Sequence, residues 1–400
     1  MSQSKKDLVS VLGAAIGKKY VLTDQESLEF YSMDVYRSIE VPIAILQPGS
    51  VEELQEVVRV ATGLDVAVVA RGGGASYTDG YLPTTSESVI IDTTRLNKIV
   101  EINEEDMYVI VESGVTWAEM YEALSAKNLR TPFWGPFSGL KATVGGSTSQ
   151  NSLSMGTSAY GGSPESILCY DIVLPHGELL KTGSSAMKNS QPFFRHYGPD
   201  LTGLFSGDAG ALGVKARITL RLIRHPSHTL TCSFGFKDYA SMSQGMAAAA
   251  REQSVSSNWG LDPQLQQGQL GSTTAKDAIQ AAFAVLRTTR NPFEAIIQLG
   301  KMALAGKRFL TGFDYSAHFV VEGYSTAEVK SKLAQTRKAV GPHGTEIANT
   351  IPTVLGAMPF MELYPILGPQ GERWVPMHGI VSFSKMQALH DSLMALYEEN

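Results

Sequence analysis

The feature that most constrains this chain is a set of three glycine-rich segments, far apart in the sequence and all before residue 220. They lie at residues 71–76, 143–147 and 207–214, and the first follows a strand-like run. Successive residues without side chains allow backbone N–H groups to converge on an anion such as a diphosphate. A single segment of this kind can also be an ordinary turn. Three of them favour a long cofactor with a diphosphate, a ribityl chain and a ring system.

The first segment matches neither of the two common nucleotide-binding motifs. The spacing of Gly72 and Gly74 places Tyr77 where a Rossmann loop needs its third glycine, and residues 78–83 continue as a loop and not as a helix. The sequence also contains no Walker-type loop with a Gly-Lys-Ser/Thr ending. These two classes of nucleotide site are therefore not expected.

The length, net charge and cysteine content of the chain indicate two domains and argue against nucleic-acid binding and metal binding. A chain of 400 residues exceeds what one hydrophobic core usually organises, so we expect two domains, residues 1–225 and 226–400. A net charge of −6, with Lys and Arg dispersed, argues against a nucleic-acid partner. The two cysteines, Cys169 and Cys232, are too few for a disulfide framework or a cysteine-rich metal site, and we expect no metal.

Neither a signal peptide nor a membrane span is expected. Residues 1–19 lack the apolar core of a signal peptide. No stretch of the sequence reaches the ~18 consecutive apolar residues that a transmembrane helix needs. These patterns predict a cytoplasmic protein.

The first half has a mixed pattern of strands and helices. Ser50, with Glu53 three residues later, predicts the start of a helix through residue 61, and residues 116–127 predict an amphipathic helix. Residues 133–162 show neither helical nor strand periodicity, which is typical of a segment that wraps a ligand. Strands are predicted at residues 41–47, 66–70, 88–92, 98–103, 108–112, 167–174 and 215–223.

The pattern changes after His225 and Pro226, which mark the expected domain boundary because proline interrupts regular structure. Beyond it, helices are predicted at residues 239–252, 273–286 and 327–340, and strands near 318–322 and 374–381.

The glycine segments and their flanking residues follow the order of a known family. Residues 42–223 resemble the FAD-binding domain of the vanillyl-alcohol oxidase/p-cresol methylhydroxylase (PCMH) superfamily of FAD-linked oxidases, which also includes flavoprotein subunits like those of glycolate oxidase and D-lactate dehydrogenase. The resemblance implies an α+β fold, with a two-part PCMH-type FAD-binding domain followed by an α+β cap domain for the substrate. The matching pieces are residues 48–53, 71–76, 91–92, 111–115, 142–146, 160–161 and 210–214.

By this resemblance the cofactor is FAD, with the first glycine segment at the diphosphate. Many relatives attach the flavin covalently to a histidine at the position of Ala75, so non-covalent binding is expected here. Many also carry a glutamate at the position of Ala209. The implied FAD-binding residues are Arg71, Gly72, Gly73, Gly74, Ala75, Ser76, Tyr77, Pro136, Ser138, Thr143, Gly145, Gly146, Ser147, Gly210, Leu212, Gly213 and Val214. A side chain at Gly73 is expected to displace the diphosphate.

The resemblance further implies an FAD-dependent oxidoreductase that oxidises a small hydroxylated substrate by hydride transfer to flavin N5. The substrate would be an alkylphenol or benzylic alcohol, or a 2-hydroxy acid. Three residues are catalytic candidates. Arg373 can bind a substrate anion, or can form a surface ion pair. His378 can act as a general base, or can be a hydrogen-bonded strand residue. Tyr160 can touch the substrate or pack under the flavin.

Arg373 and His378 are alternative candidates for the same substrate pocket. The residues between them form an apolar, strand-like run, and a strand places these two side chains on opposite faces unless Pro376 bends it. We favour Arg373 as the anion anchor, because a guanidinium stays charged without tuning.

One alternative from another class is a non-catalytic flavin-domain subunit that scaffolds a partner oxidoreductase. Family members normally continue past the cap, whereas this chain ends at Asn400, so we expect either an incomplete chain or a shortened member of the family. A reductase that uses NADPH is disfavoured, since no second nucleotide-binding pattern is present. The expected partners are a small-molecule substrate, an electron-acceptor protein or second subunit, and further copies of the chain in a homo-oligomer.

Overall fold

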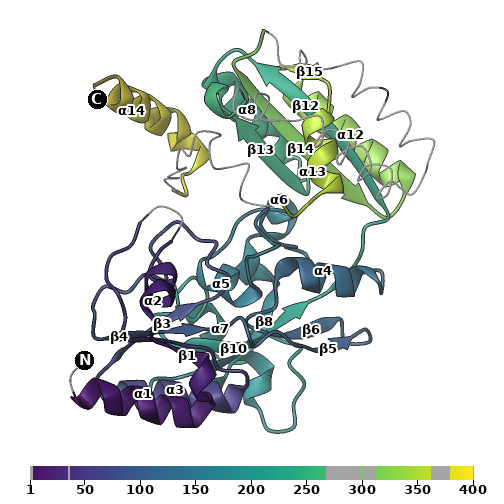
Figure 1. The fold of residues 1–400 in the computed structure, drawn as a ribbon. Coiled ribbons are helices and arrows are strands. Elements are labelled where there is room, and N and C mark those ends of the chain that lie inside the picture. Colours follow the sequence, from purple (N-terminus) through teal and green to yellow (C-terminus); the bar gives the residue numbers. More distant parts are fainter. Residues whose placement is uncertain (1–2, 35–36, 267–299, 301–311, 362–378, 400) are drawn as a thin grey trace.

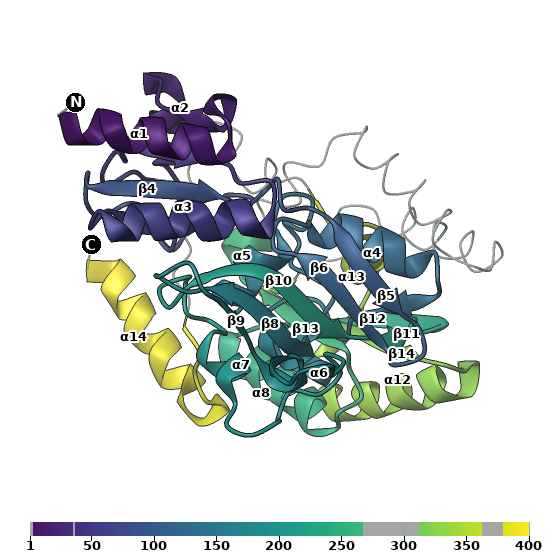
Figure 2. The same ribbon diagram turned by 90° about the horizontal axis from the view of Figure 1, so that it is seen from below.

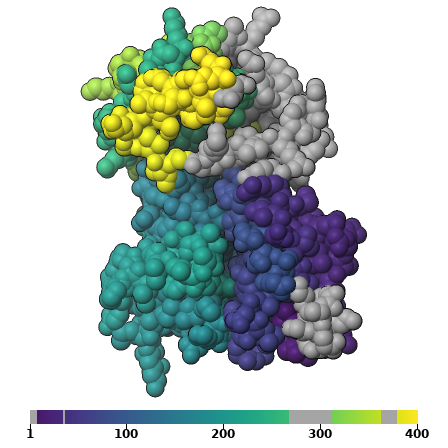
Figure 3. All heavy atoms as spheres, turned by 90° about the vertical axis from the view of Figure 1, so that its left-hand side faces the viewer, coloured from purple at the N-terminus to yellow at the C-terminus, as the bar shows by residue number. Residues whose placement is uncertain are grey.

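The structure is a computed structural model, and it describes residues 3–34, 37–266, 300, 312–361 and 379–399. The strands up to residue 224 lie in the lower part of Figure 1, and the strands from residue 228 onward lie in its upper part. In the space-filling view of Figure 3, the yellow atoms of the C-terminal helix lie above the purple and teal atoms of the first half.

The first sheet has the strand order β1-β2-β4-β3. Strands β2 and β3 both run parallel to β4, and β1 is antiparallel to β2. Helices α1 and α3 pack against this sheet and against each other (Figure 2). Apolar side chains of the two helices and of the sheet form the hydrophobic core between them. The elements are α1 (Gln3–Ile16), β1 (Val21–Leu22), β2 (Ala44–Leu46), α3 (Val51–Gly63), β3 (Ala67–Arg71) and β4 (Ser88–Asp92).

The second sheet is antiparallel and has the order β5-β6-β10-β8-β9. Helix α4 covers it, and Trp117, Met120 and Leu124 of that helix are buried in the core. Val173 and Val214 belong to the core of the first sheet, which joins the two sheets into one body. The elements are β5 (Ile99–Asn103), β6 (Tyr108–Glu112), α4 (Trp117–Ser125), β8 (Ile167–Val173), β9 (Leu179–Lys181) and β10 (Val214–Arg221).

The third sheet follows residue 225 and has the order β13-β14-β12-β15, again antiparallel. Helices α8 and α12 cover the face that carries Phe234 and Phe319. The alternation of a strand puts Ser233 and His318, which are register partners, on the opposite face. The elements are β12 (His228–Phe236), α8 (Tyr239–Arg251), β13 (Ser257–Leu261), β14 (Tyr315–Gly323), α12 (Thr326–Val340) and β15 (Thr345–Ile347).

Shorter elements connect these sheets. The pair β7–β11 joins the segment after α4 to the segment before the third sheet. These connecting and terminal elements are η1 (Lys18–Tyr20), α2 (Gln25–Tyr31), β7 (Leu129–Arg130), α5 (Val144–Ser149), α6 (Thr157–Tyr160), η2 (Ser163–Ser166), η3 (Gly183–Ala186), α7 (Leu201–Leu204), β11 (Ile223–Arg224), α13 (Thr350–Ala357), η5 (Phe383–Lys385) and α14 (Met386–Glu399).

The α+β architecture predicted from the sequence is confirmed, and most predicted elements lie within a few residues of the observed ones. The prediction that residues 133–162 lack regular structure is wrong in detail, because α5 and α6 lie there. Helix α5 contains two glycines, so it has no apolar period that a sequence pattern could detect. The predicted helix at 273–286 and most of the predicted strand at 374–381 lie outside the described residues.

Candidate functional site

A cavity of about 560 Å³ lies where the three glycine segments meet, between the end of β3 and the start of β10. Its size falls within the range of about 300–1,000 Å³ that is typical of ligand pockets. Among the described residues the wall carries two cationic side chains, Arg71 and Lys215, and no carboxylate. From the predicted FAD-binding set the wall includes Arg71, Gly72, Gly73, Gly74, Ala75, Ser76, Tyr77, Pro136, Ser138, Thr143, Gly145, Gly146, Ser147, Gly210 and Val214.

The first glycine segment is arranged to expose backbone N–H groups. The hydroxyl of Tyr81 lies 3.0 Å from the Gly74 carbonyl oxygen and 2.9 Å from that of Ser76, so both carbonyl oxygens can accept from it. No described residue accepts a hydrogen bond from the N–H groups of residues 73–76. Gly74 has a φ of +64°, a conformation that favours glycine. Such a run of unpaired N–H groups beside a cavity is suited to an anion.

Arg71 places a charge at the start of this segment. Its side chain donates to the Tyr31 carbonyl at 2.7 Å, and its guanidinium lies 4.8 and 4.9 Å from the ring centres of Tyr31 and Tyr81. Burial lowers the pKa of Arg71, although a guanidinium keeps its proton in proteins. The residue therefore holds a permanent positive charge in the cavity wall.

The second glycine segment allows two loops to pack closely. Helix α5 begins after Thr143, and the N–H groups of Val144 and Gly145 donate to Val115 and Ser113 at 2.8 and 2.9 Å. These N–H groups are therefore not available to an anion. A Cβ atom at Gly145 would lie 2.6 Å from the Cβ atom of Ser113, which explains why glycine is needed there.

The same packing corrects the expected effect of a side chain at Gly73. A Cβ atom at this position would overlap the backbone carbonyl oxygen of Lys141, which belongs to the approach to α5. The first clash therefore involves the protein itself and not a bound diphosphate. A substitution at Gly73 should separate the first and second segments.

The third glycine segment is tied to α5 by backbone hydrogen bonds. The N–H groups of Gly207 and Ala209 donate to Thr148 and Ser149 at 2.9 and 2.8 Å. Gly207, Ala209 and Gly210 have φ values of +70°, +52° and +78°. Leu212 and Gly213 are not among the cavity-lining residues, and the side chain of Leu212 is exposed. Their predicted role in FAD binding stays a prediction.

Of the three catalytic candidates, only Tyr160 lies among the described residues. Tyr160 ends α6 and is not among the cavity-lining residues. Burial raises the pKa of Tyr160, and the nearby Arg130 and Glu322 also act on it. Arg373 and His378 lie outside the described residues. Gly379 and Ile380, which follow them in the chain, line the cavity.

Two buried ion pairs were not predicted from the sequence. Arg130 on β7 donates to both carboxylate oxygens of Glu322 on β14, at 2.7 and 3.0 Å, and links the first half to the third sheet. Lys215 on β10 donates to Asp208 Oδ1 at 2.6 Å in the cavity wall. The partners are 192 and 7 residues apart, and no motif signals either pair.

Metal and membrane sites were also sought. The described part of the chain contains no group of three or more His, Cys, Asp or Glu side chains that could hold a metal ion. None of the described helices is both long enough and apolar enough to cross a membrane.

Comparison with known proteins matches part of the first half to a family. Residues 42–183 match the family described as FAD binding domain. The chain is 30% identical over 237 residues to a mitochondrial D-lactate dehydrogenase (cytochrome) of Arabidopsis thaliana, covering 58% of this chain and 40% of that protein. It is also 30% identical over 199 residues to glycolate oxidase subunit GlcD of Bacillus subtilis (strain 168), covering 49% and 40%. The chain thus spans less than half the length of these relatives.

Solved structures show the same fold over most of the chain. p-Cresol methylhydroxylase with substrate bound superposes with a TM-score of 0.71 at 19% identity, covering 92% of this chain and 72% of that one. An alkyldihydroxyacetonephosphate synthase superposes with a TM-score of 0.68 at 17% identity, covering 88% and 63%. The predicted resemblance to the PCMH-type FAD-linked oxidases is confirmed, as is the expected FAD-binding domain.

The cavity fits FAD in its charge and its hydrogen-bonding groups. The unpaired N–H groups of residues 73–76 and the cation of Arg71 suit a diphosphate. The remaining wall is formed largely by small and hydroxyl-bearing residues, which suit sugar-like and ring groups.

Proposed function

We propose that this chain is an FAD-dependent oxidoreductase that oxidises a small hydroxylated organic compound. The observation that carries the proposal is a cavity in which three distant glycine segments meet beside unpaired N–H groups and two cationic residues. The names of the relatives support the substrate class: two refer to D-lactate and glycolate, which are 2-hydroxy acids, and one to p-cresol, an alkylphenol.

The bound cofactor would supply the redox chemistry, since FAD accepts a hydride from a substrate C–H bond at its N5 atom. The chain would hold that cofactor through residues 71–76 and Arg71, with α5 and residues 207–214 completing the wall. Ala75 lines the cavity and has no nucleophilic atom, which supports non-covalent attachment.

The substrate contacts are proposed from the sequence. Arg373 would bind the carboxylate or phenolate of the substrate by charge-assisted hydrogen bonds. His378 is the alternative pocket residue and would act as a general base. The position of Tyr160 beside Arg130 and Glu322 supports a packing role for this tyrosine more than contact with a substrate.

The remaining organisation is also proposed. Residues 1–225 would form the FAD-binding domain and residues 226–400 the cap domain that covers the substrate. We propose a cytoplasmic homo-oligomer that passes electrons to oxygen, a quinone or a partner protein.

An anaerobic titration tests the function. Purified holoprotein is mixed with alkylphenols, benzylic alcohols and 2-hydroxy acids, and the visible flavin absorption is followed. Bleaching of the flavin absorption by any of these compounds supports the oxidoreductase. Flavin that no substrate reduces would favour the scaffolding subunit, and bleaching by NADPH alone would indicate a reductase.

The Arg373→Ala variant tests the anion anchor. Loss of a charge-assisted contact should raise the apparent KM and slow flavin reduction, lowering kcat/KM roughly ten- to a hundredfold. His378→Ala is the matched comparison. Normal kinetics in Arg373→Ala with an inactive His378→Ala would assign the pocket to His378.

A further inference from the structure

The cavity wall contains an ion pair to which the proposed function gives no role. Lys215 and Asp208 have side chains that are each only 2% exposed, with Nζ and Oδ1 2.6 Å apart. Lys215 lines the cavity, whereas Asp208 lies behind it. A buried ion pair is weak evidence for stability, because the cost of removing two charges from water offsets their attraction. The position of Lys215 at the wall calls for another explanation.

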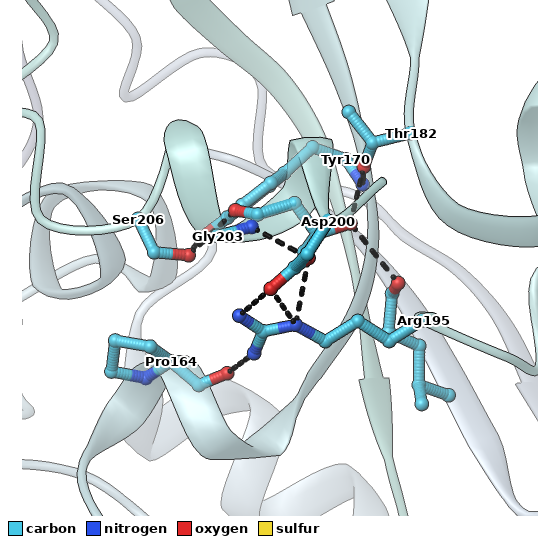
Figure 4. A network of polar contacts seen from close by, with 9 residues as sticks. Pro164, Tyr170, Thr182, Arg195, Asp200, Gly203 and Ser206 are labelled. Carbon is cyan, nitrogen blue, oxygen red and sulfur yellow. Dashed lines mark hydrogen bonds and ion pairs between the residues drawn. The ribbon is translucent and has the colours of Figure 1, made fainter. Parts of the chain in front are cut away.

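The chain holds Asp208 in a fixed position. The preceding segment is anchored by Arg195, which donates to the Asp200 carboxylate and to the Pro164 carbonyl (Figure 4). Asp200 in turn caps α7 by accepting from the Gly203 N–H at 2.9 Å, and Ser206 contacts the Tyr170 hydroxyl at 3.2 Å. Two residues after Ser206, the chain enters the left-handed conformations of the third glycine segment.

The third segment turns around the carboxylate of Asp208. The Gly210 N–H donates to Asp208 Oδ1 at 3.0 Å, and the Ala211 N–H donates to its backbone carbonyl at 2.9 Å. Ala209 has a φ of +52°, which costs a residue with a side chain roughly 1–2 kcal/mol. The strained residue directly follows Asp208, whose carboxylate contacts Lys215.

Lys215 has hydrogen-bonding capacity that its described partners do not use. An ammonium group has three N–H donors, and Asp208 is the one acceptor among the described residues. Burial lowers the pKa of Lys215, and the Asp208 carboxylate opposes this shift. The carboxylate therefore favours the charged form of this lysine, which burial disfavours.

The charge of the wall indicates which part of a ligand Lys215 meets. The chain as a whole has a net charge of −6, yet the described cavity wall has the two cations Arg71 and Lys215 and no carboxylate. The third glycine segment comes close to the start of the first, since a Cβ atom at Gly210 would lie 3.3 Å from the Cβ atom of Ala70, the residue before Arg71. FAD carries its negative charge on its diphosphate.

We propose that Lys215 is a second cationic contact for the diphosphate of FAD, and that Asp208 is a positioning residue that holds the ammonium group in the cavity wall. The inference rests on the proposed function only in taking FAD as the ligand. The N–H groups of residues 73–76 and Lys215 then bind the same diphosphate from two segments of the chain.

Calorimetric titration of the apoprotein with three probes tests this proposal. FAD and ADP contain a diphosphate, and riboflavin contains none. The Lys215→Met variant should bind FAD and ADP roughly ten- to a hundredfold more weakly than the wild type, the effect expected for one charge-assisted hydrogen bond. Its affinity for riboflavin should be unchanged. Asp208→Asn should also bind FAD and ADP more weakly, by a smaller factor, and leave the affinity for riboflavin unchanged. A general structural defect would weaken the binding of all three probes.

Two further variants keep the test decisive. Lys188→Met removes an exposed lysine and should leave all three affinities unchanged. If Lys215→Met fails to fold because Asp208 is left buried and unpaired, the double variant Asp208→Asn/Lys215→Met removes both charges and should show the same loss of ADP affinity. Equal losses for ADP and riboflavin, or unchanged ADP affinity, would overturn the role of Lys215. A wild-type apoprotein that bound neither FAD nor ADP would instead refute the proposed function.

Discussion

The first half of the chain and the third sheet differ in whether their polar groups have hydrogen-bond partners within the protein. In the first half, the N–H groups of residues 73–76 lie beside a cavity and have no acceptor among the described residues. In the third sheet, His318 is held between Ser233 and Ser316 at 2.9 and 3.1 Å, and Glu322 is paired with Arg130. Unpaired groups beside a cavity indicate binding, whereas groups paired within the core indicate structure. Substitutions in the two regions should therefore change different quantities.

The largest effect is expected at the contact between the two regions. Arg130→Met leaves Glu322 buried and unpaired, and should lower the free energy of unfolding by about 3–5 kcal/mol. Burial would raise the pKa of Glu322, but the Arg130 guanidinium holds it below its ordinary value. Urea unfolding measures the loss. The double variant Arg130→Met/Glu322→Leu should recover most of it, and a single-variant loss below about 1 kcal/mol would contradict the assignment.

A smaller stability loss with a large binding loss is expected at Gly73. In Gly73→Ala, the new Cβ atom overlaps the Lys141 carbonyl, so the first and second glycine segments must separate. We expect a stability loss of about 1–3 kcal/mol and no detectable flavin after purification. Gly63→Ala is the control, because a Cβ atom there meets nothing within 4 Å. A Gly73→Ala protein that kept its flavin would show that this packing does not shape the site.

The pH dependence of stability should reveal the paired histidine of the third sheet. Burial lowers the pKa of His318 to about 3. The unfolded chain, with a histidine pKa near 6.5, then binds more protons than the folded chain between pH 3 and 6.5. His318 therefore contributes stability above pH 6.5 that is lost as the pH falls, with a slope of up to about 1.4 kcal/mol per pH unit.

Urea unfolding at pH 7, 6 and 5 measures this slope in the wild type and in His318→Gln. Because glutamine has no proton to gain, the variant should show the shallower dependence. Equal slopes in the two proteins would mean that His318 is not buried in its neutral form.

Two helix caps give the smallest effect and compare the regions directly. Thr116 caps α4 in the first half, and Ser325 caps α12 beside the third sheet. Thr116→Ala and Ser325→Ala should each cost about 0.5–2 kcal/mol. Thermal unfolding with added FAD should offset the first loss more than the second, since FAD stabilises the region that binds it. An equal offset would mean that the two regions unfold as one unit.

Local features of the sequence predicted the first half well. Ser50 was readable as a cap because an N-cap depends on residues a few positions apart. The glycine segments were readable for the same reason, and the cavity brings them together. The two short helices within residues 133–162 were missed, because α5 is held by contacts with Val115 and Ser113 that no local period encodes.

The third sheet and the ion pairs depended on distant contacts. Strands β12 and β13 were not predicted, and the pairing of Arg130 with Glu322 joins residues 192 positions apart. Lys215 was included in a predicted strand but received no role, because its pairing with Asp208 depends on the turn that the third glycine segment makes around that carboxylate. Sequence motifs therefore located the glycine segments that meet at the cavity, whereas the pairing of its charged residues depends on tertiary packing.

The most direct test of the account is the affinity of the apoprotein for FAD compared with FMN, measured by quenching of flavin fluorescence. A cavity built from three glycine segments and two cations should bind one FAD per chain and bind FMN much more weakly, because FMN lacks the diphosphate and the adenosine. Equal affinity for FAD and FMN, or no binding of either, would contradict the assignment of this cavity as an FAD site.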